Sequence, residues 1–176
     1  AGVSNTSALA FGGRNAPPDS QGVVESWDGS SWTEVADLNT ARNYLGGFGT
    51  QTAALAFGGV PSGTGATEEW NGSGWTEVAD LNTARRSLGG AGTTSAGLAF
   101  GGTPPVTGAT EEWIGAGANV GAWSTGGDLN AVKSGVAGAG TQAAGIAFGG
   151  VVHPNTYVGQ TEFYDGTSWT EQGDLN

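Results

Sequence analysis

The stretch Gly49–Gly59, which reads Gly-Thr-Gln-Thr-Ala-Ala-Leu-Ala-Phe-Gly-Gly, decides the fold because near-copies of it recur along the chain. The tripeptide Phe-Gly-Gly begins at Phe11, Phe57, Phe100 and Phe148. Each copy is followed by a tryptophan and then by Asp-Leu-Asn, and these tripeptides end at Asn39, Asn82, Asn130 and Asn176. A fixed period of this length is typical of repeat proteins. The chain therefore divides into the units 1–39, 40–82, 83–130 and 131–176.

Within a unit, short segments of strand type alternate with turn residues, as in an all-β fold. In the third unit we predict strands at Ser87–Thr93, at Gly97–Phe100, at Thr110–Trp113 and around Trp123. The chain has 35 glycines among 176 residues. Each would destabilise a helix by about 1 kcal/mol relative to alanine. We therefore expect an all-β protein without helices.

Repeated units of four antiparallel strands fit the blades of a β-propeller, here a single domain over residues 1–176. A linear β-solenoid is the alternative. Its coils are usually shorter and need no hairpin turn inside each unit, whereas Trp70-Asn71-Gly72 is a typical hairpin signal. The pattern favours the propeller.

The third unit carries Arg85, then Ala99-Phe100-Gly101-Gly102, then Glu111-Glu112-Trp113, then a second tryptophan and Asp-Leu-Asn. This order resembles the Kelch repeat over essentially the whole chain. The resemblance implies a propeller in which the first strand of each unit lines the axis. The near-identical units are also similar to Kelch-type arrays in structural proteins of marine bacteriophages and in bacterial surface proteins.

Kelch propellers usually have five to seven blades, and this chain has four. Four blades could close alone, two chains could share an eight-bladed ring, or further sequence could complete the ring. The small residues of Leu88–Thr93 would let inner strands approach the axis closely, which favours a closed four-bladed ring. The chain also begins inside a repeat, which suggests a piece of a longer protein.

Charge and composition exclude several classes of function. The net charge of −11 argues against a nucleic-acid partner and disfavours an anionic membrane surface. No cysteine is available for a disulfide, a thiolate metal site or a nucleophile. No apolar stretch is long enough to insert into a membrane. We expect no cofactor and no metal.

Acidic and aromatic residues recur in register and allow two interpretations. The glutamates are Glu25, Glu68, Glu111 and Glu162, the aspartates are Asp37, Asp80, Asp128 and Asp174, and the tryptophans are Trp32, Trp75, Trp123 and Trp169. They could form a ring of ligands for a cation or a sugar. The favoured interpretation is structural. Each glutamate pairs with Arg42, Arg85 or Lys133, each aspartate caps its own turn into the next blade, and each tryptophan packs between blades.

No motif indicates an enzyme. Asp28-Gly29-Ser30-Ser31-Trp32 resembles the Asp-box of sialidases, but it lacks the residue that separates Asp from Gly there. A hairpin turn between the third and fourth strands accounts for these residues. Copper oxidation of the galactose-oxidase kind would need a cysteine-linked tyrosine. His153, the one histidine, has no obvious partners for a metal site or a triad.

Recognition is expected where the units differ, in the connections between the second and third strands. These connections are Arg14–Gly22, Val60–Gly65, Thr103–Gly108 and Val151–Gln160. The candidate ligand-binding residues are Arg14, Asn15, Asp19, His153, Asn155 and Tyr157. On the opposite face, the turn Ile114–Ala122 is longer than its counterparts and could be a second contact.

The sequence thus predicts a non-enzymatic binding or adhesion module, such as a receptor-binding element of a phage fibre or a cell surface. Its partner would be a glycan or a surface protein, and its location extracellular or on a virion. The alternative is a structural assembly subunit of a virion or surface particle that associates with itself or with the rest of the particle.

Overall fold

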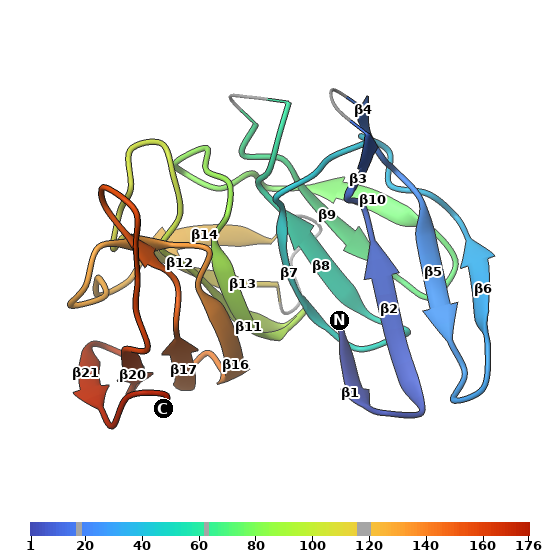
Figure 1. Cartoon of the computed structure of the whole chain (residues 1–176). Coiled ribbons are helices and arrows are strands. Elements are labelled where there is room, and N and C mark those ends of the chain that lie inside the picture. Colours follow the sequence, from blue (N-terminus) through green and yellow to red (C-terminus); the bar gives the residue numbers. More distant parts are fainter. Residues whose placement is uncertain (17–18, 62–63, 116–120) are drawn as a thin grey trace.

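The computed structural model describes residues 1–16, 19–61, 64–115 and 121–176, and it contains only β-strands within these ranges (Figure 1). The prediction of an all-β protein is therefore confirmed. Among the described residues no helix could span a membrane. Four sheets have four antiparallel strands each, and every one of these sheets takes all its strands from one repeat unit.

The four large sheets follow the chain. The first contains β1 (Gly2–Ser4), β2 (Ser7–Phe11), β5 (Val24–Trp27) and β6 (Trp32–Val35). The second contains β7 (Gly46–Gly49), β8 (Ala54–Phe57), β9 (Thr67–Trp70) and β10 (Trp75–Val78). The third contains β11 (Gly89–Thr93), β12 (Ala96–Phe100), β13 (Thr110–Ile114) and β14 (Ala122–Thr125). The fourth contains β16 (Ala137–Thr141), β17 (Ala144–Phe148), β20 (Thr161–Tyr164) and β21 (Trp169–Gln172).

In the third unit the structure matches the predicted strands to within a few residues. The first strand begins at Gly89 instead of Ser87. Ser87 has a φ of 54°, in the left-handed region, where an extended strand cannot continue. The backbone enters the sheet only after this residue.

Two small sheets lie outside the large ones, and the sequence analysis did not predict them. β3 (Arg14–Ala16) pairs with β4 (Asp19–Ser20). β15 (Lys133–Ser134) pairs with β18 (Val151–Val152), which pairs with β19 (Thr156–Tyr157). Isolated bridges join Asn43 to Val60 and Arg86 to Thr103 in the same way. In units two to four, the connection between the second and third strands is thus fixed to the segment that leads into the first strand.

The first strands of neighbouring units lie side by side, β7 against β11 and β11 against β16. Gly90 in β11 faces the ring of Phe57 from the preceding sheet, and a Cβ atom there would lie 2.6 Å from the ring. These strands surround a cavity of about 290 Å³, whose lining is mainly glycine and alanine with Phe48. Within the described ranges, none of the sheets closes on itself. A closed ring of four blades stays a prediction.

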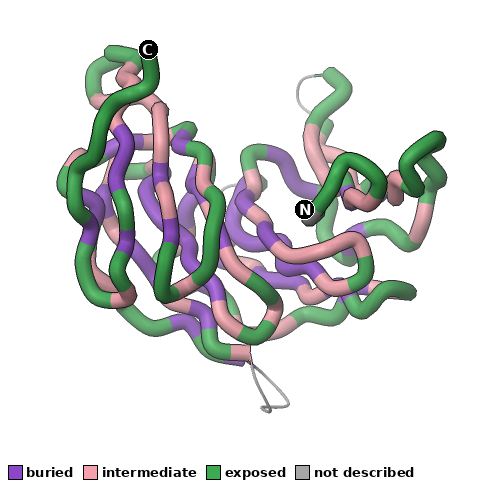
Figure 2. The backbone as a smooth tube through the Cα atoms, turned by 90° about the horizontal axis from the view of Figure 1, so that it is seen from below, coloured by how far each residue is buried: buried purple, intermediate pink, exposed green. Residues whose placement is uncertain are grey.

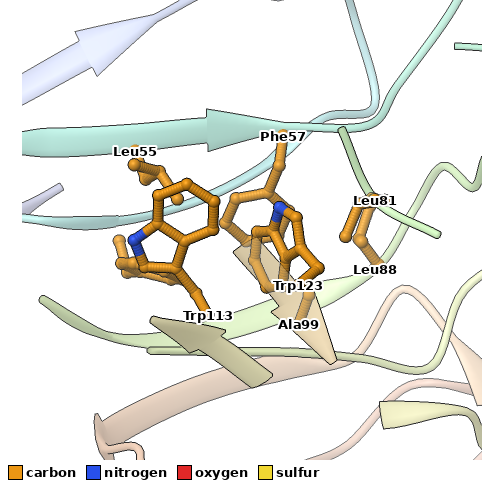
Figure 3. Close-up of a cluster of buried hydrophobic side chains, with 8 residues drawn as sticks. Leu55, Phe57, Leu81, Leu88, Ala99, Trp113 and Trp123 are labelled. Carbon is orange, nitrogen blue, oxygen red and sulfur yellow. The ribbon is translucent and has the colours of Figure 1, made fainter. Parts of the chain in front are cut away.

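The core fills the junctions between consecutive sheets. Trp123 of the third unit packs edge-on against Phe57 of the second, with ring centroids 5.2 Å apart (Figure 3). Leu81 and Leu88 complete the same cluster. Along the backbone tube in Figure 2, the buried segments lie in the sheets, whereas many of the connecting turns are exposed. Tryptophan packing between units is confirmed for Trp75, Trp123 and Trp169.

Candidate functional site

A buried ion pair stands at the same place in units two, three and four. Arg42 Nη2 lies 2.9 Å from Glu68 Oε1, and both side chains are buried. Arg42 Nη1 also donates to the carbonyl oxygens of Gly58 and Ala66. Burial lowers the pKa of Arg42, and the Glu68 carboxylate opposes that shift. The equivalent pairs are Arg85 with Glu111 at 2.9 Å and Lys133 with Glu162 at 3.1 Å.

The predicted pairing of these glutamates with the lead-in bases is therefore confirmed, but the asparagine beside them was missed. Asn39 N donates to Glu68 Oε2 at 2.7 Å, and Asn39 Nδ2 donates to the carbonyl of Trp75 at 3.1 Å. Asn82 and Asn130 repeat both bonds. The last residue of each of the first three Asp-Leu-Asn tripeptides thus ties one sheet to the next. Its identity in every unit was the available signal.

For two of the four repeated aspartates, Asp80 and Asp128, the structure gives a different partner from the predicted one. Asp80 Oδ1 accepts from Thr67 N at 3.3 Å, and Asp128 Oδ1 accepts from Thr110 N at 3.4 Å. Asp80 and Asp128 therefore cap the start of the third strand in their own sheets. Asparagine makes the bonds that cross the junction.

The turns between the third and fourth strands match the hairpin prediction. Asp28 Oδ1 accepts from the N–H groups of Ser30 and Ser31, and Gly29 has a φ of 98°. These bonds, the one from Ser31 first, lower the pKa of Asp28 to about 2. Asp165 has the same environment and a pKa of about 2. Residues 116–120 of the longer turn in unit three lie outside the described residues.

The first unit departs from this pattern at its outer edge. Trp32 is 48% exposed, whereas its counterpart Trp123 is 7% exposed. Glu25 is exposed and has no ion pair within the described part of the chain. Among the described residues, both side chains are thus left open to solvent. The prediction that Trp32 packs between blades and that Glu25 pairs with a base was therefore wrong for this unit.

The predicted ligand-binding residues lie on two separate units. Arg14 and Asn15 are exposed in β3, and Asp19 is exposed in β4. His153 and Asn155 are exposed before β19, and Tyr157 within it is 85% exposed. In Figure 1 β3 and β4 lie at the upper right, while the orange segment of the fourth unit lies on the left. The structure brings together the residues of each unit, and it does not bring the two sets together.

Tyr44 is a residue that the sequence analysis missed. Its φ is 54°, and its side chain is 51% exposed. The guanidinium carbon of Arg14 lies 5.8 Å from the centre of its ring. Ser87 N donates to the carbonyl of Tyr44 at 2.8 Å, and Gly135 N donates to that of Ser87 at 2.7 Å. Ser87 and Gly135 occupy the equivalent positions, and that glycine was the available signal of a left-handed site.

A hollow of about 200 Å³ lies beside Arg14 in the first unit. Its lining residues are Ala10, Phe11, Gly12, Arg14, Asn15, Gln21, Val23 and Glu25. In the described ranges no three His, Asp or Glu side chains gather as a metal site. The polar side chains in the lining belong to Arg14, Asn15, Gln21 and Glu25.

These features define an all-β repeat protein in which four-stranded antiparallel sheets pack side by side through aromatic rings and buried ion pairs. The arrangement is propeller-like. The solved structure titled "Structure of YjhT" is similar, with a TM-score of 0.79 and 11% sequence identity, over 97% of this chain and 68% of that chain. No protein-family description matches the sequence. No curated protein matches it either. The likeness at this identity concerns the fold alone.

Proposed function

We propose that this chain is a non-enzymatic binding module of Kelch type, which recognises a glycan or a surface protein through the connections between second and third strands. The observation that carries the proposal is Arg14, which lies in the first of these connections and over the ring of Tyr44, an exposed residue at a left-handed backbone position in the adjacent lead-in to β7. We place the module on an extracellular surface or a virion, as an adhesin or fibre element.

The backbone at Tyr44 makes tyrosine a costly choice. A left-handed conformation costs a residue with a Cβ atom roughly 1–2 kcal/mol, and glycine avoids that cost. The fourth unit has Gly135 at this position, with a φ of 62°. Since half of the Tyr44 side chain is exposed, packing does not explain the aromatic ring. Tyrosine and arginine are enriched among the residues that dominate binding energy, which supports a role in recognition.

The frame beneath the loops is suited to hold such residues still. Ser20 Oγ donates to the carbonyl of Val60 at 3.4 Å, and Asn43 Nδ2 donates to Ser20 Oγ at 2.9 Å. These bonds join the variable connections of units one and two. A preorganised surface loses less entropy on binding. Three of the four repeated glutamates are buried in ion pairs, which speaks for a structural and not a catalytic role.

The test is a screen of the purified chain against a glycan array and a panel of surface proteins, followed by affinity measurement for any ligand. Two variants separate the candidate surfaces, Arg14→Ala with Tyr44→Ala, and Asn155→Ala with Tyr157→Ala. We expect one of them to lose about tenfold or more in affinity, equivalent to about 1.4 kcal/mol.

The matched control changes three exposed threonines of the outermost strands to alanine, namely Thr33, Thr76 and Thr170. The control should bind like the parent chain. Full affinity in both loop variants would refute recognition through this face.

A second candidate function is a structural assembly element of a virion or surface particle. It is favoured by apolar residues left uncovered at the two ends of the array of sheets. Trp32 of the first unit is 48% exposed, and Leu175 of the fourth is 57% exposed, whereas Leu38, Leu81 and Leu129 are buried. Such an element would bind stably to copies of itself or to the rest of the particle, and it would bind no separate ligand.

A further inference from the structure

The hairpin turn between β9 and β10 surrounds one side-chain oxygen with three hydrogen-bond donors. Asn71 Oδ1 accepts from Ser73 N at 2.9 Å, from Ser73 Oγ at 2.8 Å and from Gly74 N at 3.0 Å. Asn71 N itself donates to the carbonyl of Gly74 at 3.2 Å, which closes the turn. Asn71, Gly72 and Ser73 are exposed. The amide oxygen is therefore held in one place, in a turn that solvent can reach.

Two other units have an aspartate at this position, with the same donors around it. Asp28 Oδ1 accepts from Ser30 N and Ser30 Oγ, each at 2.8 Å, and from Ser31 N at 2.9 Å. These bonds, with that of Ser31 N first, lower the pKa of Asp28 to about 2. Asp165 makes the equivalent three bonds and has a pKa of about 2 as well. The donors thus favour a negatively charged oxygen, whereas Asn71 places a neutral amide among them.

The residue that follows Asn71 offers a backbone nitrogen next to this amide. Gly72 is exposed and has a φ of 93°. Within the described residues, no backbone carbonyl accepts a hydrogen bond from Gly72 N. Because glycine has no Cβ atom, its own side chain does not hinder a reaction at this nitrogen. The nitrogen and the side-chain carbon Cγ of Asn71 can close a five-membered ring.

We propose that Asn71 deamidates in the folded protein and that the turn promotes the reaction. Gly72 N loses its proton to hydroxide and attacks Cγ of Asn71, so that a new C–N bond forms. The bond from Cγ to the amide nitrogen breaks, and that nitrogen takes a proton from water and leaves as ammonia. Water then opens the resulting succinimide. Attack at the side-chain carbonyl gives an aspartate at position 71, and attack at the backbone carbonyl gives an isoaspartate.

The three donors act on the atom where charge develops. When the nitrogen adds to Cγ, Asn71 Oδ1 becomes negatively charged. Donors that already surround such an oxygen stabilise the charge without a rearrangement of the turn. They stabilise the charged oxygen more than the neutral amide, and only this difference accelerates the step. The same donors stabilise the aspartate product, which resembles the turn at Asp28.

Asn5 is an internal comparison within the same chain. It is exposed in the turn between β1 and β2, and Thr6 follows it. In the described part of the chain, the hydrogen bonds of that turn use the backbone carbonyl of Asn5 and the side chains of Ser4 and Thr6. Asn5 is therefore as accessible as Asn71, but it has neither the glycine nor the donors. The inference is independent of the proposed binding and assembly roles, since it uses one turn of the second unit.

The test incubates the purified intact chain at mildly alkaline pH and follows each asparagine by peptide mapping with mass spectrometry. A peptide with the sequence of residues 69–76, Glu-Trp-Asn-Gly-Ser-Gly-Trp-Thr, is incubated beside it as the unfolded reference. We expect position 71 to react in the folded chain at least as fast as in the peptide, while Asn5 stays intact. Each converted chain gains one negative charge beyond the net charge of −11, which ion-exchange chromatography detects.

Ser73→Ala removes the hydroxyl donor and keeps both backbone donors. We expect it to slow the reaction in the folded chain by about tenfold, the worth of one hydrogen bond to a charged oxygen. Ser30→Ala is the matched control, because it removes the same hydroxyl from the turn of the first unit and should leave the rate at position 71 unchanged. A slower reaction in the folded chain than in the peptide, or equal rates in Ser73→Ala and the parent chain, would overturn the proposal.

Discussion

The substitution Glu111→Gln tests whether the repeated ion pairs hold the sheets together. Glu111 and Arg85 are 4% and 2% exposed, and the carboxylate accepts from Arg85 Nη2 at 2.9 Å and from Asn82 N at 2.7 Å. Glutamine is nearly isosteric, but it removes the negative charge and turns one acceptor into a donor. The guanidinium is then buried without a counter-charge, which costs about 3–5 kcal/mol.

The assay is urea unfolding followed by tryptophan fluorescence. With an m-value of about 2 kcal/mol per molar urea, a loss of about 3 kcal/mol lowers the midpoint by roughly 1.5 M. Glu25→Gln is the matched control, because Glu25 is the same residue of the repeat without an ion pair. Its change should stay within about 0.5 kcal/mol. A small shift for Glu111→Gln, or equal shifts for both variants, would refute the reasoning.

Three further predictions concern packing and titration. Trp123→Ala should cost about 3–5 kcal/mol in the free energy of unfolding, whereas Trp32→Ala should cost about 1 kcal/mol or less; urea midpoints compare them. Gly90→Ala should push against the Phe57 ring and cost about 1–3 kcal/mol, measured by thermal unfolding. Asp28 should titrate near pH 2 in carboxyl-detected NMR. Because this pKa is below the ordinary value of 3.8, the turn's contribution to stability is present above pH 3.8 and is lost as the pH falls through 2.

The repeated glutamate has different surroundings in the first unit and in the other three. In units two to four, a glutamate holds the base of its own sheet and the asparagine that ends the preceding sheet. In the first unit, Glu25 is exposed and forms no ion pair among the described residues. An identical residue is therefore buried frame at one place and an accessible acceptor at another.

Local pattern within the sequence determined the strands, the turns and the partners within a unit. Equivalent positions of the four units can be compared with one another. The pairing of Glu68 with Arg42 and the turn at Asp28 were therefore predicted from the position in the repeat and the residue type. The Phe-Gly-Gly period likewise predicted four-stranded sheets, since alternation and turn residues act over only a few positions.

Tertiary structure decided what depends on residues far apart. Asn39 reaches Glu68 across a junction, a separation of 29 residues, and the asparagine gives no local sign of that bond. The left-handed φ of Tyr44 arises where its carbonyl meets the next unit. Glu25 and Glu68 occupy the same position in their repeats, but Glu68 is buried in an ion pair and Glu25 is exposed. Whether a side chain is buried depends on residues of the neighbouring units, which the sequence of a single unit does not include.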